Sequence, residues 1–598
     1  MKPTNVTDPG YYGRVVDCQW ACPAHTNVPE YIRLIGQGRY DDAYLLNRET
    51  NVFPGILGRT CDRPCEPACR RGRVDSEPVA ICRLKRVAAD LRGDIRSRLP
   101  AVPASKNGRR IAAVGCGPAS LTVANDLLPL GYQVTIFERG PQTGGLMRVG
   151  IPTFRLPEAV LDQEIGDILA MGADVRFNSP VESLRELLAQ GFDAIFLGSG
   201  APRGKELEIP GRHDGDGDGH VLIGLDWLAA IAFGHVRAVG RRVLIIGVGN
   251  TAMDCCRSAR RLGGEEVTVV ARRPRAFFKA SAWELADAEE EGVAIEVNLA
   301  PRRFVHEDGR LVGVEFNRLE WDERAESCER REAVFLPADD VILAVGQENA
   351  FPYLDEDLSM AKDAWGCPVV DPETMMSSLA GVFVGGDAAF GAKNIVTAVA
   401  QAHVAARSID RFCSGRVLEE RPTQTVSFSS RKLGLAEWSY ANDFNPVGRQ
   451  QSAYADLARR FSDLGIEAEL GLSAAQAARE IERCLNCDIE TVFMAERCIE
   501  CDACLDVCPV QCLTIRENDT EEELRQRLRA PSLDPAAPLF VSAPLRQTGR
   551  VMLKDENLCV HCGLCAERCP TAAFDMARFE ARIAHLSVTT VATGGGPA

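Results

Sequence analysis

The chain has 598 residues, of which 46% are hydrophobic and 25% are charged, a composition that predicts several ordinary globular domains. Its net charge of −16 disfavours a nucleic-acid-binding surface, since phosphate binding needs a basic patch and the basic runs of this sequence are only pairs. No apolar run approaches the roughly 18 residues of a transmembrane helix, and the first residues lack the apolar segment of a signal peptide, so we expect no membrane span.

The 23 cysteines gather near the two ends of the chain. Six lie between Cys18 and Cys82, and eleven lie between Cys484 and Cys569. Disulfide scaffolds belong to small secreted domains, so clustered thiols in a chain of this length indicate metal ligands in a reducing cytoplasm. The cysteines outside these patterns are expected to be packing residues: Cys116, Cys255, Cys256, Cys328, Cys367, Cys413 and Cys512.

The first nucleotide-binding pattern begins with a buried strand predicted at residues 110–115. Gly115 permits the following turn, and Gly117 lets a pyrophosphate approach the N-terminus of the next helix. A second predicted strand ends at Glu138, whose carboxylate can bond a ribose hydroxyl. Strand, turn, helix and acid together predict a dinucleotide-binding fold, although Ser120 replaces the third glycine and predicts slightly looser packing between helix and strand.

The same pattern recurs at residues 242–271, where Gly247 and Gly249 form the turn. The strand that follows ends at Arg272 and Arg273 rather than at an acid. Arginine suits the 2′-phosphate of NADP, whereas an acid would select NAD, so the sequence favours NADP(H). NAD(H) stays open if these arginines are only a solvated strand end. Two such folds in one chain predict a flavin site and a nicotinamide site.

The C-terminal region contains the spacing C-x2-C-x2-C-x3-C-P twice. This doubled run is that of bacterial two-cluster ferredoxins, in which the fourth cysteine of each run binds the other cluster. We therefore assign one 4Fe–4S cluster to Cys498, Cys501, Cys504 and Cys569, and a second to Cys559, Cys562, Cys565 and Cys508. Zinc also uses C-x2-C pairs and is the alternative. Residues 509–558 between the runs are expected to be a surface insertion or a partner-docking element, with a capped helix at 520–529.

Six motifs between residues 17 and 410 resemble those of one flavoprotein family: GCGPAS, GGLMRVGIPTFRLP, GVGNTAMD, ARR, ELADAEEEGV and FVGGDAAFGAKNIVTAVAQA. The family is that of the glutamate synthase small subunit, with the N-terminal half of dihydropyrimidine dehydrogenase and the NADP-side subunit of ferredoxin-dependent transhydrogenases. By this resemblance, the residues that hold FAD are Gly115, Gly117, Glu138, Gly145, Leu146, Asp387 and Thr397. The residues that hold NADPH are Gly247, Gly249, Asn250, Thr251, Arg272 and Arg273. Ser120 and Ala402 stand where the family usually has glycine.

The resemblance implies an α/β fold with two Rossmann-like nucleotide-binding domains, an N-terminal α-helical iron–sulfur domain and a C-terminal α+β ferredoxin-like domain. The predicted division is a helical iron–sulfur domain at 1–105, FAD-binding parts at 106–235 and 336–415, an NADPH-binding domain at 236–335, a linker and cysteine-bearing helix at 416–490, and the ferredoxin-like domain at 491–598.

The family's N-terminal domain binds two clusters, but here its first cysteine run is incomplete. Cys82 lies near the place of a non-cysteine ligand in the family, and the pair Cys484 and Cys487 resembles the missing half of the first run. A helix with a capping box at Ser473 and Gln476 precedes this pair. Our hypothesis gives one cluster to Cys22, Cys61, Cys65 and Cys82 and another to Cys18, Cys69, Cys484 and Cys487, making four in total. The alternative is three clusters, with Cys484 and Cys487 as free thiols.

The expected function is electron transfer between NAD(P)H, FAD, the iron–sulfur clusters and another protein. The segment GGLMRVGIP has no cysteine pair, which disfavours the dithiol chemistry of disulfide reductases. No segment is left for a substrate domain, so we expect a hetero-oligomeric complex with a ferredoxin or a partner subunit, for example of a 2-oxoacid:ferredoxin oxidoreductase or an aromatic-ring reductase. The alternatives are a glutamate synthase small subunit and a non-catalytic iron–sulfur or zinc scaffold. No catalytic side chain is assigned, and Glu284 is either near the nicotinamide or on a helix surface.

Overall fold

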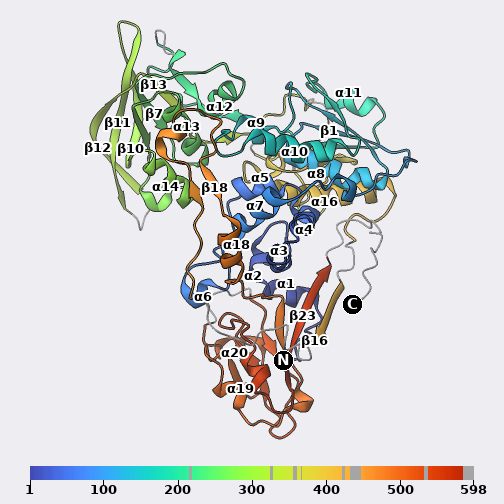
Figure 1. Cartoon of the computed structure of the whole chain (residues 1–598). Helices are drawn as coiled ribbons and strands as arrows, with labels where there is room; N and C mark the ends of the chain where they lie inside the picture. Colours follow the sequence, from blue (N-terminus) through green and yellow to red (C-terminus); the bar gives the residue numbers. More distant parts are fainter. Residues whose placement is uncertain are drawn as a thin grey trace. The chain divides into compact units, whose positions relative to one another are not determined.

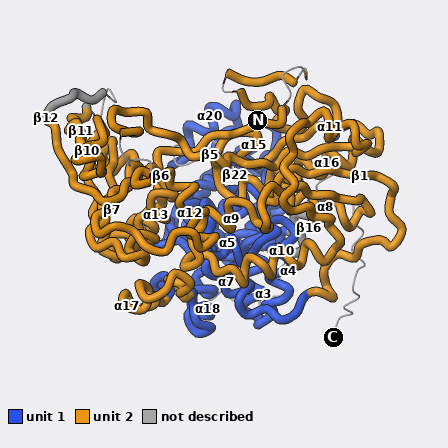
Figure 2. Tube along the Cα trace, turned by 90° about the horizontal axis from the view of Figure 1, so that it is seen from above, with its two compact units in different colours: residues 1–95, 420–452, 471–598 blue, residues 96–419, 453–470 orange. Residues whose placement is uncertain are grey.

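A computed structural model of the chain describes all residues except 215–218, 323–326, 355–357, 359, 365, 421–424, 431–445, 531–536 and 583–598. The chain forms two compact units (Figure 2), of which unit 1 contains residues 1–95, 420–452 and 471–598, and unit 2 contains residues 96–419 and 453–470. The two cysteine-rich ends of the chain therefore fold as one unit. Among the described residues, no helix is long and apolar enough to cross a membrane. The finer domain boundaries expected from the sequence remain predictions.

The first nucleotide-binding domain of unit 2 is built on a five-stranded parallel sheet in the order β15-β4-β1-β2-β3. Its strands are β1 (Arg110–Val114), β2 (Gln133–Phe137), β3 (Asp174–Arg176), β4 (Ala194–Leu197) and β15 (Val382–Val384). The accompanying helices are α8 (Pro118–Leu127), α9 (Leu146–Val149), α10 (Glu158–Leu169), α11 (Leu184–Ala189), α15 (Asp387–Phe390) and α16 (Ile395–Cys413). Four of the five residues of β1 are buried, as expected for a parallel sheet covered on both faces. The two strands predicted from the first nucleotide-binding pattern are confirmed.

The second nucleotide-binding domain has a parallel sheet in the order β6-β13-β7-β8-β9. Its strands are β6 (Val221–Ile223), β7 (Arg242–Ile246), β8 (Glu266–Val270), β9 (Ala294–Glu296) and β13 (Asp340–Leu343). Its helices are α12 (Gly224–Ala232), α13 (Asn250–Arg261) and α14 (Ala282–Glu290). An antiparallel sheet follows in the chain, formed by β10 (Leu299–Glu307), β11 (Arg310–Asp322) and β12 (Ser327–Pro337). The short strands β5 (Arg203–Gly204) and β14 (Gln347–Glu348) pair with each other.

Residues 453–470 return to unit 2 from within the predicted linker. They contain β17 (Ala453–Tyr454) and α17 (Leu457–Arg460), and they end in β18 (Glu469–Gly471). Two hydrogen bonds join this return segment to the loop before α10: Thr153 donates to the Leu464 carbonyl over 2.8 Å, and the Ala468 amide donates to the Phe154 carbonyl over 2.9 Å.

The N-terminal part of unit 1 is helical, as predicted. Its helices are α1 (Pro9–Val15), α2 (Asp17–Ala21), α3 (Val28–Gly36), α4 (Tyr40–Asn51), α5 (Pro54–Thr60), α6 (Gly72–Asp75) and α7 (Ile81–Leu91). Helix α18 (Ala474–Ile481) contacts α3 and α7 and places Ala477 in the same hydrophobic core. The predicted capping box is present, since Ser473 and Gln476 each accept from the other's backbone amide. Helix α18 therefore brings the Cys484 pair to the N-terminal helices.

The C-terminal part of unit 1 contains two small antiparallel sheets and short helices. One sheet has the order β16-β23-β19, so β23 (Phe574–Arg582) lies between β16 (Thr425–Ser430) and β19 (Ile489–Phe493). Figure 1 shows β16 beside β23. The other contains β20 (Leu513–Arg516), β22 (Val551–Lys554) and β21 (Phe540–Val541). The helices are α19 (Ala503–Asp506), α20 (Glu521–Gln526) and α21 (Leu564–Arg568). Helix α20 is shorter than the predicted 520–529, but its cap at Thr520 is the one expected.

Candidate cofactor sites

The turn after β1 leaves an open backbone at the position predicted for a pyrophosphate. Gly115 has a φ of 87°, and a Cβ there would lie 2.9 Å from the Gly198 carbonyl oxygen. An added Cβ at Gly117, the N-cap of α8, would meet no atom within 4 Å. No described side chain caps α8, so the amides of its first turn remain available to an anion.

Glu138 lies at the end of β2, as predicted, and is bonded to the turn. Its carboxylate accepts the amides of Cys116 over 2.7 Å and of Gly140 over 2.8 Å. Ser120 is fully buried in α8. A Cβ at Gly198 would lie 2.3 Å from the Ser120 hydroxyl, so the glycine at 198 provides the room that the serine at 120 takes up.

Two further predicted FAD segments lie against this turn and α8, and a third, at Thr397, begins α16. A Cβ at Gly145, immediately before Leu146 and α9, would lie 3.1 Å from the Gly117 Cα. A Cβ at Gly386, immediately before Asp387, would lie 3.2 Å from the Cβ of Ala119 in α8. Burial raises the pKa of the Asp387 carboxyl, which accepts the Lys393 amide over 2.9 Å. The Thr397 amide is capped by the Asn394 side chain at the start of α16.

Replacing Gly117 with alanine is expected to lower FAD content without unfolding the chain. The new methyl meets no protein atom, but it would occupy the space that a phosphate needs to reach the amides of α8. Losing one charge-assisted hydrogen bond costs about 1.5–3 kcal/mol, or roughly 10- to 100-fold in affinity. The matched control is Gly166→Ala in α10, where an added Cβ also meets nothing. Bound flavin per chain after gel filtration is the measurement, and full flavin retention by G117A would contradict the assignment.

The second turn repeats this geometry after β7. Gly247 has a φ of 126°, and a Cβ there would lie 2.2 Å from the Ala344 carbonyl oxygen. Gly249 is the N-cap of α13, and an added Cβ would meet nothing. Asn250 and Thr251 begin α13, and the Asn250 side chain accepts the Ser281 amide over 2.9 Å. This contact fixes the loop before α14 against the turn.

Arg272 and Arg273 lie beyond the end of β8 and are exposed. The Arg273 guanidinium lies 5.7 Å from the centroid of the Trp321 ring, whose indole donates to the Arg272 carbonyl. Within the described part of the chain, neither arginine forms an ion pair with a carboxylate. Both cations are therefore available to a phosphate ligand.

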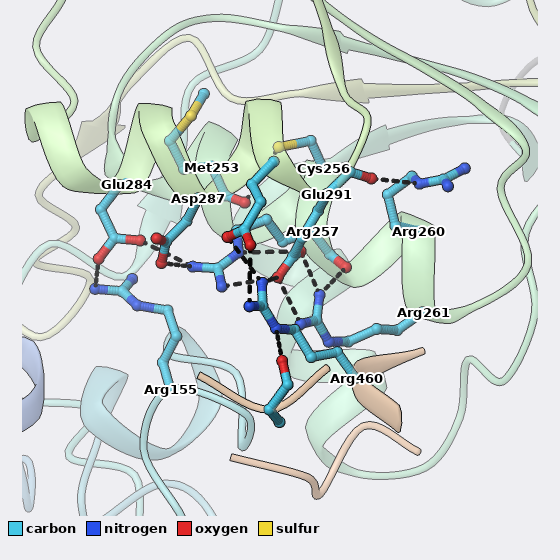
Figure 3. Close-up of polar contacts among 12 residues, drawn as sticks. Arg155, Met253, Cys256, Arg257, Arg260, Arg261, Glu284, Asp287, Glu291 and Arg460 are labelled. Atoms are coloured by element: carbon cyan, nitrogen blue, oxygen red, sulfur yellow. Dashed lines mark hydrogen bonds and ion pairs between the residues drawn. The ribbon is translucent and has the colours of Figure 1, made fainter. Parts of the chain in front are cut away.

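A buried ion network joins α13 to α14 (Figure 3). Glu284 is 4% exposed, and its carboxylate pairs with Arg155 over 2.5 Å and with Arg257 over 3.2 Å. Glu291 accepts from Arg257 and from Arg261, and all three side chains are almost completely buried. Of the two roles considered for Glu284, the helix-surface role is therefore wrong, because arginines and not water surround it.

In unit 1, the sixteen predicted metal-ligating cysteines lie in four groups. Cys22, Cys61, Cys65 and Cys82 form the Cys22 group, in which Cys61 interacts electrostatically with Cys82, and Cys65 with Cys22 and Cys82. Lys85 is buried beside all four sulfurs and has no carboxylate partner among the described residues.

The Cys18 group joins cysteines from the two ends of the chain. A pocket is lined by Cys18, Cys69, Cys484 and Cys487, with Arg70 in the same wall. Burial, together with the neighbouring Cys69, Cys487 and Cys484, raises the pKa of the Cys18 thiol well above its usual value. The structure thus brings together the four cysteines of the four-cluster hypothesis.

The two remaining groups follow the ferredoxin spacing. A second pocket is lined by the Cys498 group, which is Cys498, Cys501, Cys504 and Cys569. The Cys559 group is Cys508, Cys559, Cys562 and Cys565, whose thiols interact electrostatically. Cys512, predicted as a packing residue, is buried and its sulfur lies 3.5 Å from that of Cys508. The side chain of Cys328 lies outside the described residues.

Buried cations accompany three of these groups. Lys85 interacts electrostatically with the Cys22 group, Arg70 lines one pocket with Cys487 of the Cys18 group, and Lys554 interacts electrostatically with Cys559. A buried charge needs a counter-charge. Four neutral thiols would not supply one beside Lys85, whereas a cluster held by four thiolates is anionic, so the residues present fit iron–sulfur clusters. Sequence reasoning missed all three cations, because no spacing rule links them to the cysteines.

Comparisons with known proteins agree with this arrangement. The family model of pyridine nucleotide-disulphide oxidoreductases matches residues 109–406, that of dihydropyrimidine dehydrogenase domain II with a 4Fe–4S cluster matches 12–95, and that of the 4Fe–4S dicluster domain matches 497–573. The chain is 35% identical over 504 residues to the NADP(+)-dependent formate dehydrogenase subunit beta of Moorella thermoacetica, covering 79% of this chain and 70% of the relative.

Two other relatives extend the comparison. The NADPH-Fe(3+) oxidoreductase subunit beta of Geobacter sulfurreducens is 33% identical over 531 residues, which cover 81% of this chain and 77% of the relative. The glutamate synthase [NADPH] small chain of Azospirillum brasilense is 31% identical over 423 residues, or 67% of this chain and 86% of the relative. The chain therefore belongs to the glutamate synthase small subunit-like family of FAD- and NADPH-dependent iron–sulfur oxidoreductases, with a ferredoxin-like dicluster domain at its C-terminus.

Proposed function

We propose that this chain passes electrons between NADPH and a separate partner, either a ferredoxin or the catalytic subunit of a complex in the cytoplasm. Bound FAD exchanges two electrons with NADPH and can release them singly, while 4Fe–4S clusters carry one electron each. The role of the protein is then to hold the nucleotide, the flavin and the clusters so that electrons can pass from one to the next. The relatives named as beta subunits and as a small chain support a partner subunit.

The observation that carries the proposal is the continuous order of the four cysteine groups in unit 1. Cys65 of the Cys22 group lies in one hydrophobic core with Cys18. Arg70 lines the pocket of the Cys18 group and donates to the Cys559 carbonyl over 2.8 Å. Helix α19, which contains Cys504, contacts α21, which contains Cys565 of the Cys559 group.

The series of cysteine groups ends at the protein surface. Cys501 of the Cys498 group is exposed, and the adjoining Ile499 is 48% exposed. The cysteines of the Cys22 group are buried. An exposed final group supports transfer to another protein at this end of unit 1.

The test is anaerobic reduction of the purified chain by NADPH. The proposal predicts loss of the flavin absorption band together with the broad cluster absorption, followed by reduction of an added bacterial ferredoxin. NADH at the same concentration is the comparison. If the flavin is reduced while all clusters stay oxidised, the proposed transfer is contradicted.

The double variant Arg272→Ala and Arg273→Ala is expected to lose its preference for NADPH. Hydrogen bonds to a charged partner contribute about 1.5–3 kcal/mol, so the KM for NADPH should rise roughly 10- to 100-fold while that for NADH changes little. Arg275→Ala is the matched control, because Arg275 is exposed nearby but already pairs with Glu289. An equal rise in KM for NADPH and for NADH would show that the two arginines do not bind the 2′-phosphate.

A further inference from the structure

We propose that Trp321 determines the preference for NADPH over NADH: its ring and that of Phe277 hold the Arg273 guanidinium where it can bind the 2′-phosphate. The inference rests on the proposed function, in which Arg272 and Arg273 bind that phosphate. It adds a positioning residue from β11, in the antiparallel sheet β10-β11-β12, which contains none of the residues predicted to bind a nucleotide.

The two arginines lie beside the second phosphate turn. Strands β7 and β8 are parallel neighbours that end together, with Ile246 opposite Val270. The Gly247 amide in the turn donates to the Val270 carbonyl over 3.0 Å. A dinucleotide with its pyrophosphate at the N-terminus of α13 would therefore place its adenosine ribose at the end of β8. Arg272 and Arg273 follow directly at this end.

The loop that contains these arginines is anchored at both of its ends. At its start, the Ala271 carbonyl accepts the Leu299 amide over 3.0 Å. At its end, the Ala280 amide donates to the Val248 carbonyl over 3.1 Å, within the phosphate turn. Between these two points lies a short 3-10 helix, Arg275–Phe277. The backbone of the loop is thus fixed against the turn, and what holds the long arginine side chains is a separate question.

The Arg273 guanidinium lies against two aromatic rings. Its carbon atom Cζ is 5.7 Å from the centroid of the Trp321 ring and 6.0 Å from that of Phe277. The two ring centroids are 5.9 Å apart, and the ring planes are inclined by 31°. A cation within about 6 Å of an aromatic centroid is attracted to the face of the ring. Because the rings come from the loop and from β11, Arg273 connects these two segments.

Trp321 also holds the backbone at the neighbouring arginine. Its indole Nε1 donates to the Arg272 carbonyl over 3.1 Å. An indole nitrogen can only donate, so this carbonyl satisfies the one polar group of the side chain. One tryptophan therefore contacts both arginines, Arg272 through its backbone and Arg273 through its guanidinium.

This arrangement leaves both arginines able to bind a phosphate. A guanidinium that rests on a ring face still has N–H donors in its own plane, directed away from the ring. No carboxylate pairs with Arg272 or Arg273 in the part of the chain that the structure describes. A side chain that is already held loses less rotamer freedom when its ligand binds. Trp321 should therefore strengthen binding of the 2′-phosphate and do nothing for NADH, which has a hydroxyl there.

The experiment measures how the full-length chain binds adenosine 2′,5′-bisphosphate and adenosine 5′-monophosphate, which differ only in the 2′-phosphate. Trp321→Leu removes one ring and the indole donor, and Phe277→Leu removes the other ring. The preference for the bisphosphate, taken as the ratio of the two dissociation constants, should fall about 5- to 20-fold in W321L and about 2- to 5-fold in F277L. Phe335→Leu is the control and should leave the ratio unchanged, because it removes an exposed ring from β12 of the same sheet.

A double-mutant cycle separates positioning from a general loss of structure. In a chain that already has Arg273→Ala, adding Trp321→Leu should lower the preference less than it does in the wild type, since part of its effect acts through the Arg273 guanidinium. Effects of the two replacements that simply add would overturn the inference.

An unchanged preference in W321L overturns the inference as well. So does an equal fall in affinity for both ligands, which would show that the ring binds the adenine instead of positioning Arg273. If W321L does not fold, F277L decides by the same criteria, because that replacement leaves the antiparallel sheet intact. If the double variant of Arg272 and Arg273 keeps the full preference, the proposed 2′-phosphate site itself is contradicted.

Discussion

Replacing Cys484 with serine is expected to remove one cluster, so that iron falls by about four atoms per chain. Cys484 lies outside both matched iron–sulfur regions, residues 12–95 and 497–573, yet it lines the pocket that also contains Cys18 and Cys69. A 4Fe–4S cluster needs a thiolate at each of its four iron corners, and a serine hydroxyl is a poor replacement for a soft sulfur ligand. Loss of the cluster should also weaken the attachment of helix α18 to the N-terminal helices, because the cluster would add a cross-link to their hydrophobic contacts.

The matched control for this variant is Cys367→Ser. Cys367 is a half-buried free thiol of unit 2 that belongs to none of the four groups. Iron and acid-labile sulfide are measured on chains purified anaerobically side by side, with EPR of the reduced state to count clusters. If C484S keeps all its iron, the three-cluster alternative is favoured and the shared cluster is contradicted.

Replacing Glu291 with glutamine is expected to destabilise the second nucleotide-binding domain by about 3–5 kcal/mol, the usual result of breaking a buried ion pair by removing one partner. Glu291 is the common acceptor for Arg257 and Arg261, and all three side chains are at most 1% exposed. The two guanidinium groups also lie 5.1 Å and 3.8 Å from the ring centroid of the buried Phe154 (Figure 3 shows the arginines). Without the Glu291 charge, two neighbouring buried cations would repel each other.

The destabilisation should depend on pH in a defined direction. Burial alone would raise the pKa of Glu291, but the hydrogen bonds and charges of Arg261 and Arg257 outweigh it and lower the pKa from 4.5 to about 2. A lowered folded-state pKa contributes stability that is present above pH 4.5 and is lost as the pH falls from 4.5 towards 2. The difference between wild type and E291Q should therefore be largest near neutral pH and shrink across this window.

Urea unfolding of the two proteins at several pH values provides the measurement. Glu290→Gln is the control, because the Glu290 side chain is 52% exposed and pairs with Arg460 at the edge of the network. The Glu290→Gln replacement should lower the free energy of unfolding by no more than about 1 kcal/mol. A constant difference between E291Q and wild type down to acidic pH would contradict the charge-based explanation.

The local patterns of the chain were sufficient to predict both nucleotide-binding turns. The alternation of buried strand, glycine turn and helix is a short-range signal, and β1, β2, β7 and β8 form where it occurs. The capping box at Ser473 could likewise be predicted from the sequence, since it involves residues three positions apart. The spacing of the ferredoxin cysteines encodes their grouping in the same way.

The remaining features depend on contacts between distant segments. Glu284 could be read as a surface residue because its helix pattern does not reveal that Arg155 covers it. The return of residues 453–470 to unit 2 has no local signature. Arg70 and His561 are 491 positions apart, and only the folded unit shows that they meet. Pairing of buried charges is a tertiary property, and a single sequence carries no spacing rule for it.

The central claim is that one chain holds a flavin and four iron–sulfur clusters, one of them completed by cysteines from both of its ends. Iron, acid-labile sulfide and FAD measured on the anaerobically purified wild-type chain test it most directly. The account predicts about sixteen iron atoms and about sixteen sulfides per FAD, as required by four 4Fe–4S clusters. About eight iron atoms per chain, the content of the ferredoxin-like domain alone, or a chain that retains no FAD, would contradict it.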